Sequence, residues 1–332
     1  MGLRFRRSIR LLPGVRLNLS RSGVGLSVGV PGARFTYGAD GRRRTTVGLP
    51  GTGLSWVEET GSRRRPPRPE PVPPRAAAPA KPPGLFADRD RRRLHRALTE
   101  RDWETAATVA DVDEALALAA RTVAGLGWLA DGDPARARPL LAAVIADGRD
   151  PADDGFIRDY VAPAGNWSVT VSPGATASLP VSRDLVGLAL AELLQADGEP
   201  AAAIDVLESL TPTTIVAASL AELYLLERRW TDLVELTEAL EAVDDVTCWL
   251  LSCRGGALRA LGQPGAATEA LTAALRRRSL DPVVRNLALV ERASAWLDLG
   301  QRAKARRDLD RVIAHDADFP GVDAVQARLG TG

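Results

Sequence analysis

The stretch Leu250–Leu275, LLSCRGGALRALGQPGAATEALTAAL, contains one short turn between two segments of helical periodicity. The turn is centred on Gly262. A small residue, Gly255, lies seven positions before it, and Ala267 and Leu271 follow it by five and nine positions. Small and large side chains at these offsets let two antiparallel helices approach closely and interlock. The stretch therefore predicts a helix–turn–helix unit.

The same pattern recurs outward from this stretch, and successive turns are 66, 30, 34 and 38 residues apart. Such a repeat predicts an α-solenoid, because each helix pair buries its apolar face by stacking on the next pair. The aligned turns are centred on Gly132, Gly198, Arg228, Gly262 and Gly300, and the small residues seven positions earlier are Gly125, Ala191, Ala221, Gly255 and Ala293.

These offsets resemble the tetratricopeptide repeat, a helix–turn–helix unit of about 34 residues. The resemblance covers residues 111–320, and we expect an extra helix pair at 88–110 and a closing helix at 320–330. It implies a concave groove lined by the first helix of each pair, without the Lys and Asn cluster with which chaperone-binding members hold a C-terminal carboxylate. We expect a helix or an extended peptide there. The predicted partner-binding residues are Glu192, Gln195, Glu222, Trp249, Arg259 and Ser294.

The first spacing exceeds one repeat by 32 residues, which predicts an insertion at about residues 149–182. Its segments FIRDYV, NWSVTVS and TASLPVS alternate in polarity between Pro and Gly residues, so we expect a β-hairpin between the first two repeats. The insertion either decorates a loop or carries Tyr160 and Trp167 over the groove to contact a ligand.

Residues 1–60 show the period-two alternation of strands, with Pro-Gly and Gly-rich turns between them, and predict a meander of five or six short strands. The glycines at 23, 25 and 29 do not have dinucleotide-binding spacing and precede a strand rather than a helix. The start MGLRFR, the stretch PGVRLN and the motif TTVGLPGTGLS resemble the bacterial family called domain of unknown function 4236. That resemblance implies a small N-terminal β module and no assigned activity.

The segment SRRRPPRPEPVPPRAAAPAKPPG, residues 62–84, is too proline-rich for a helix or a ladder and predicts a flexible linker. A proline-rich ligand for an aromatic groove is the alternative. We therefore expect a multidomain α+β protein: an all-β module at 1–60, a Pro/Arg-rich linker at 61–85, and a tetratricopeptide-like all-α solenoid at 86–332 with a β-hairpin insertion.

The net charge of +1 hides an asymmetry, because residues 1–65 carry +10, residues 66–84 carry +2 and residues 85–332 carry −11. Alternation along the N-terminal strands predicts a positive sheet face that suits an anionic polymer or surface. The partner stays open among nucleic acid, an acidic protein, a lipid surface and the acidic solenoid of the same chain. The predicted anion-binding residues are Arg4, Arg6, Arg10, Arg16 and Arg34.

Catalytic chemistry has few candidates in this sequence. His95 and His315 are its two histidines, and no metalloprotease, Cys-x-x-Cys, nucleophile-elbow or phosphate-loop pattern occurs. We expect no enzyme activity, no cofactor and no metal. Paired carboxylates such as Asp153-Asp154 and Asp244-Asp245 are expected to cap helices.

Two cysteines are too few for a disulfide framework, and no apolar run reaches membrane-spanning length, which together favour a cytoplasmic protein. The sequence predicts a non-enzymatic adaptor or scaffold whose groove binds a protein or peptide, with the basic β module as a second contact surface. The alternative function is binding of nucleic acid or an anionic surface through the Arg-rich module.

Overall fold

The computed structural model describes side chains at residues 82–84, 87–163, 179–277 and 279–330. Elsewhere it gives only the backbone of Ala164 and of strands at 7–12, 15–20, 23–30, 33–37, 43–48, 55–60, 167–172 and 175–178. The chain divides into two compact units, and among the residues whose side chains are described the division falls between Val216 and Ala217. Each unit is described by itself below.

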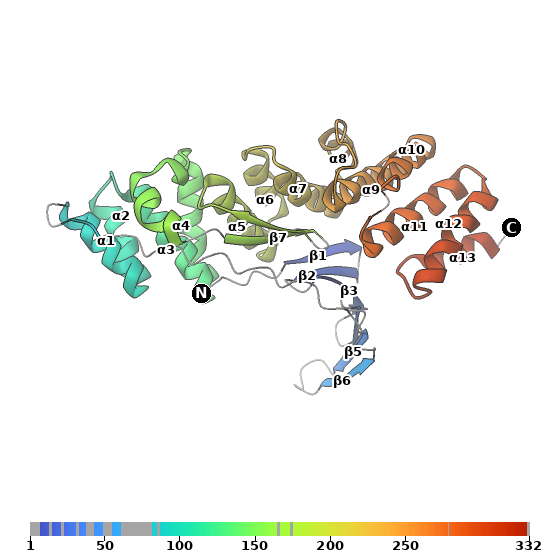
Figure 1. Ribbon diagram of the computed structural model, residues 1–332, viewed down its shortest axis with the longest axis horizontal. Coiled ribbons are helices and arrows are strands. Elements are labelled where there is room, and N and C mark those ends of the chain that lie inside the picture. The colour runs from blue at the N-terminus through green and yellow to red at the C-terminus, as the bar shows by residue number, and fades with distance from the viewer. Residues whose placement is uncertain are drawn as a thin grey trace. The chain divides into compact units, whose positions relative to one another are not determined.

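Six helices of the first unit form antiparallel pairs, and each packs on the next along the chain (Figure 1). Their bounds are α1 (Arg89–Glu100), α2 (Trp103–Val112), α3 (Ala117–Asp131), α4 (Pro134–Asp147), α5 (Arg183–Ala196) and α6 (Pro200–Glu208). The predicted extra pair at 88–110 is therefore present as α1 and α2.

The second unit continues the same pattern after α7, which contains the boundary between the units. The helices here are α7 (Thr214–Leu226), α8 (Trp230–Leu236), α9 (Asp245–Ala260), α10 (Pro264–Ala274), α11 (Pro282–Asp298), α12 (Arg302–His315) and α13 (Val322–Gly330). The last of them is the predicted closing helix, and it packs on both α11 and α12.

All five turns predicted from the repeat have left-handed backbone. The φ angles are +84° at Gly132, +80° at Gly198, +56° at Arg228, +74° at Gly262 and +70° at Gly300. Such a residue reverses the chain and lets backbone N–H groups close the last helical turn. The register of the sequence repeat is therefore confirmed.

Close approach within the pairs is also as predicted. A Cβ on Gly255 would lie 2.4 Å from Leu271 Cγ, and one on Gly125 would lie 2.8 Å from Leu141 Cδ2. Both leucines are completely buried and lie nine positions after their turns. The missing side chain therefore makes room for the large residue of the second helix.

Carboxylates cap several helices, as expected. Asp244 accepts a hydrogen bond from the Thr247 backbone N–H at 2.8 Å, and the Asp244 backbone N–H donates to the Thr247 hydroxyl at 3.0 Å, which together form a capping box at the start of α9. Asp154 accepts from the backbone N–H groups of Phe156 and Ile157. These carboxylates satisfy N–H groups that have no partner inside their helix.

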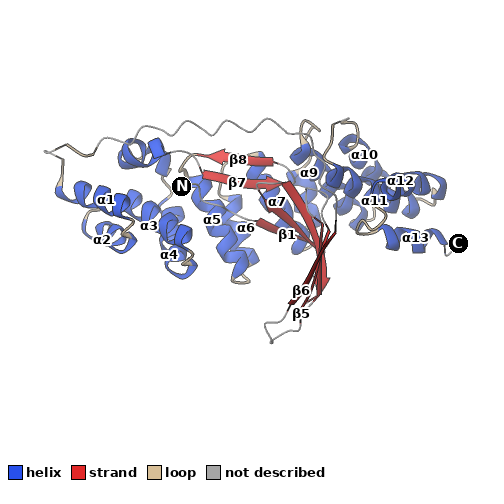
Figure 2. Ribbon diagram, turned by 60° about the horizontal axis from the view of Figure 1, so that its bottom comes forward, coloured by secondary structure: helices blue, strands red, loops and turns tan. Residues whose placement is uncertain are grey.

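We predicted a multidomain α+β protein with an all-β module and a β-hairpin insertion. This fold class is wrong for the residues whose side chains the structure describes. Apart from Leu179, which ends a backbone ladder, those residues lie in helices or in the loops between them, so that part is an all-helical array of stacked pairs (Figure 2). The structure does not establish an all-β module. A single antiparallel layer has no second layer to cover its apolar face, so alternation alone does not build a core.

The insertion shows the physical reason for part of the error. The segment FIRDYV is not a strand, because Ile157–Val161 form a π-helical turn that Asp154 initiates. Phe156 and Ile157 are adjacent and both about 1% exposed, whereas neighbouring residues in a strand point to opposite faces. Two buried neighbours thus exclude a half-buried strand at this point.

Outside the described side chains, the backbone forms ladders only. Strands β1 (Arg7–Leu12), β2 (Val15–Ser20), β3 (Gly23–Val30), β4 (Ala33–Tyr37), β5 (Arg43–Gly48) and β6 (Ser55–Thr60) pair in sequence order, antiparallel, and β7 (Trp167–Ser172) pairs with β8 (Ala175–Leu179). The predicted linker at 61–85 lies almost entirely outside the described residues. The domain boundaries at 60 and 85 stay predictions.

A charged row on the first helices of the second unit

Four charged side chains meet across α9, α11 and α13. Arg259 on α9 donates from Nε to Asp298 Oδ2 at 2.8 Å and from Nη1 to Glu291 Oε2 at 2.8 Å. Arg328 on α13 donates from Nη2 to Asp298 Oδ1 at 2.7 Å. We call Arg259, Glu291, Asp298 and Arg328 the charged row. Its hydrogen bonds connect α9 to α11 and α11 to α13.

The surroundings of Asp298 and Arg259 favour the charged form of each. Burial raises the pKa of the Asp298 carboxyl, but hydrogen bonds and charge from Arg259 and Arg328 outweigh it and hold that pKa below its ordinary value. Burial opposes the charge on Arg259 as well, yet Asp298 and Glu291 raise the pKa of its guanidinium. Because the side chains of Arg259 and Asp298 are 26% and 29% exposed, the row remains accessible to a partner.

Of the predicted groove residues in this unit, the structure brings Arg259 into the row and places Ser294 on α11 one helical turn before Asp298, 9% exposed. Glu222 on α7 is 6% exposed. Trp249 on α9 is 1% exposed, and its Nε1 has no hydrogen-bond partner among the described residues. The Trp249 ring therefore belongs to the core in this conformation.

Glu192 and Gln195 lie half-buried on α5 in the first unit. The six predicted groove residues are therefore divided between two separately described units. The first unit has an apolar hollow of about 230 Å³ of its own, and its lining includes Thr122, Val123 and Leu126 from α3.

Sequence reasoning missed Glu291 and Arg328, whereas the family resemblance already placed Asp298 on the concave surface. A signal for Glu291 existed, since residues 291 and 298 are seven positions apart and share one face of α11. Arg328 had no such signal, because α13 closes the array and lies outside the aligned repeats. The missed residues supply two of the four charges in the row.

Catalytic and metal chemistry has limited support here. His95 stacks edge-on against Tyr160 with ring centroids 5.0 Å apart, and burial lowers the pKa of its imidazole. His315 lies in the other unit. Burial, with the charges of Glu291 and Glu222, also raises the pKa of the Cys253 thiol far above its ordinary value, which makes it a poor nucleophile.

Three carboxylates, those of Asp88, Asp90 and Asp113, place one oxygen each within 4.8 Å of one another, close enough to hold a metal ion. Two of them already have local roles. Asp88 accepts from the Asp90 and Arg91 backbone N–H groups at the start of α1, and Asp113 accepts from the Ala115 N–H. Helix capping and turn formation account for this group.

The predicted anion-binding arginines fall outside the described side chains. For Arg10, Arg16 and Arg34 the structure gives only backbone pairing, in which Arg10 lies opposite Arg16, and Arg4 and Arg6 are not described at all. Anion binding by these five residues stays a prediction. In the described part of the chain, no helix combines the length and the apolar character that crossing a bilayer requires.

Comparison with known proteins gives matches for both predicted resemblances. Residues 3–57 match the family described as "Protein of unknown function (DUF4236)". No curated protein matches this chain. Similar solved structures include the N-terminal domain of the EccA1 ATPase from the ESX-1 secretion system of Mycobacterium tuberculosis, which is 18% identical with a TM-score of 0.46, covering 74% of this chain and 91% of that chain.

Two further similar structures carry tetratricopeptide-type repeats. A putative kinesin light chain from Podosopora anserina with nearly identical TPR-like repeats is 21% identical with a TM-score of 0.37, covering 66% of this chain and 99% of that chain. A thermophilic TPR protein of Thermus thermophilus is 15% identical with a TM-score of 0.35, covering 64% of this chain and 98% of that chain. These likenesses concern the fold alone.

Proposed function

We propose that the protein is a non-enzymatic interaction scaffold whose second unit binds a protein or peptide partner along the charged row. The observation that carries this proposal is the lateral bonding of the row, in which Asp298 accepts from Arg259 on one side and from Arg328 on the other. A stacked helical array offers an extended surface of this kind, since each pair adds one first helix to it.

The charges support a polar partner segment. The row alternates in sign, so it suits a segment that carries both basic and acidic side chains rather than a single terminal carboxylate. Its side chains are already held by neighbours, which lowers the entropy lost when a partner binds. We place this activity in the cytoplasm, where the buried free thiols of Cys248 and Cys253 would stay reduced.

Charge reversal in the row tests the proposal. The double variant Glu291→Lys/Asp298→Lys removes both acceptors of Arg259, while Glu269→Lys makes a reversal of the same kind at an exposed position of α10. Partners captured from lysate by the wild-type chain should be lost by the double variant and retained by Glu269→Lys. The loss should be reproduced with the purified partner by calorimetry.

Circular dichroism and thermal melting must first show that both variants fold. A partner retained equally by all three proteins would contradict the proposed surface, and so would a wild-type chain that captures none.

A further inference from the structure

Three cations form a stripe along one flank of α12, in the second unit. Lys304, Arg307 and Arg311 follow one another by three and four positions, so at about 100° per residue they lie within about 60° of one another around the helix. All three are exposed, and the side chain of Arg311 is 67% exposed. We call these residues the basic stripe.

The carboxylates of α12 leave the basic stripe positive. Asp308 is buried and accepts hydrogen bonds from Arg292 at 2.7 and 2.8 Å, whereas the Nη1 of Arg311 lies 3.8 Å from it. Asp310 points about 100° away from Arg311 around the helix. Arg307 has no ion-pair partner among the residues that the structure describes. The stripe therefore keeps its charge for a partner.

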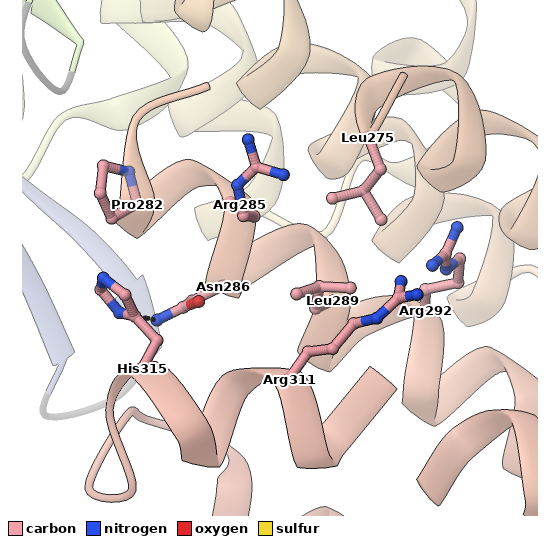
Figure 3. A pocket seen from close by; sticks show the side chains of 8 residues that line it. All are labelled: Leu275, Pro282, Arg285, Asn286, Leu289, Arg292, Arg311 and His315. Carbon is pink, nitrogen blue, oxygen red and sulfur yellow. Dashed lines mark hydrogen bonds between the residues drawn. The ribbon is translucent and has the colours of Figure 1, made fainter. Parts of the chain in front are cut away.

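The surroundings of the stripe are partly apolar. Arg311 lines a cavity of about 310 Å³ between α11 and α12, where its side chain extends away from His315 (Figure 3). Lys304 places its Nζ 4.2 Å from the centre of the half-buried Trp296 ring. Three positive charges thus lie along about 10 Å of helix, with an aromatic ring at one end.

The same unit carries a complementary surface at the end of α8. Glu235 lies in the last turn of this helix, and Glu238 and Glu241 follow it at intervals of three residues. All three are exposed, and none of them has an ion-pair partner in the described part of the chain. Val243, which is 61% exposed, adds an apolar side chain beside them. We call the three glutamates the acidic edge.

The two surfaces are kept apart within one molecule. Helix α8 packs on α9, and α12 packs on α11 and α13, so that α9, α10 and α11 separate the acidic edge from the basic stripe along the array. Each surface is therefore left for a partner on another molecule.

The charge of the array favours a short acidic partner for the stripe. Residues 85–332 carry −11, and an extended polyanion such as nucleic acid would meet this negative field on either side of the stripe. A short acidic surface meets the stripe alone. The acidic edge is such a surface, and it offers three carboxylates to three cations at the same concentration as the stripe itself.

We infer that the basic stripe of one molecule binds the acidic edge of a second copy, so that the chain self-associates through its second unit. The contact is heterologous, because two different surfaces meet. It goes beyond the proposed scaffold function and uses none of the four residues of the charged row.

Sedimentation velocity of the full chain over a range of protein concentrations tests the inference. We expect association at about 0.1 M salt and its loss at about 1 M, because the screening length falls from about 10 Å to about 3 Å. Arg307→Glu/Arg311→Glu reverses the stripe, and Glu235→Lys/Glu238→Lys reverses the acidic edge. Each double variant should associate at least about tenfold more weakly than the wild type.

An equimolar mixture of the two double variants gives the sharpest comparison. The first variant has two acidic surfaces and the second has two basic ones, so the mixture should form complexes although neither variant associates alone. Arg306→Glu is the control, since Arg306 is exposed on α12 but points about 140° away from Arg311. It should associate like the wild type.

A wild-type chain that stays monomeric at both salt concentrations would overturn the inference. A mixture that forms no complexes, from variants that circular dichroism shows to be folded, would do the same, as would an equal loss in Arg306→Glu. Loss of association in the acidic-edge variant alone would also contradict it, because the acidic edge would then bind a basic segment other than the stripe.

Discussion

Gly255 has no side chain, and the place of its Cβ is taken by Leu271, whose Cγ lies 2.4 Å from that point. The substitution Gly255→Ala should overpack the contact between α9 and α10, which costs about 1–3 kcal/mol and exceeds the gain of about 1 kcal/mol or less from helix propensity. Gly256→Ala is the control, because its nearest neighbour is Glu291 Oε2 at 3.8 Å. Chemical denaturation should show a lower free energy of unfolding for the first variant and a higher one for the second. The same sign for both would contradict the packing.

Asp298 and Asp281 should respond oppositely to pH. Asp298 has a folded pKa below its ordinary value, so its contribution to stability is present above the unfolded pKa of about 3.9 and is lost as pH falls through the folded pKa. Burial raises the pKa of Asp281, so its contribution is present at low pH and is lost as pH rises through the folded pKa.

Denaturation between about pH 3 and pH 7 checks this difference. Asp298→Asn should lower the free energy of unfolding at pH 7, with little effect at the lowest pH. Asp281→Asn should raise it at pH 7 relative to pH 3, since asparagine can still accept the Val283 N–H at the helix cap. Parallel profiles for the two variants and the wild type would show that neither carboxyl has the shifted pKa.

The turn between α7 and α8 is strained because Arg228, with φ of +56°, occupies the position at which Gly132, Gly198, Gly262 and Gly300 stand in the other aligned turns. Left-handed backbone costs a non-glycine residue about 1–2 kcal/mol. Arg228→Gly should therefore raise the free energy of unfolding by about 1 kcal/mol, whereas Arg228→Ala should not. Thermal melting of the two variants makes the comparison, and a gain for alanine equal to that for glycine would exclude relief of strain.

Helices and turns were predicted correctly where a residue type has a single structural role. A glycine between two helical patterns marks a left-handed turn, and the offset from Gly255 to Leu271 marks a close contact within a pair. Segment FIRDYV misled because alternating polarity takes no account of Asp154, whose side chain starts a helical turn and buries two neighbours at once. The cavity lined by Arg285, Arg292 and Arg311 had no signal in the sequence, because these side chains come together only through the packing of α11 and α12.

At the scale of the whole molecule, packing between the α-helices is local along the chain. Among the described α-helices, every pair with extensive contact is one or two helices apart in the helix order. The turn at Ile157–Val161 is an exception, because Tyr160 stacks on His95 of α1. Trp249 illustrates the limit of prediction at this scale, because its offset in the repeat places it on a first helix but does not reveal how completely its neighbours cover it.

A local change should therefore stay local. In hydrogen exchange followed by mass spectrometry, Gly255→Ala should speed exchange in α9, α10 and α11 and leave α2, α3 and α4 unchanged, because stability in a stacked array passes between neighbours. Faster exchange of equal size throughout the described helices would indicate a single cooperative unit instead.

Helix packing that reaches only the next one or two helices also bears on how such a chain can change over evolutionary time. An in-frame duplication or deletion of one helix pair replaces one junction with another of similar shape and leaves distant helices in their native surroundings. The turns are irregularly spaced, and an extra segment lies between α4 and α5. Changes of this kind can accumulate in such an array without loss of the fold. Gene rearrangement can therefore alter the length of the array more readily than point substitution can alter its interior.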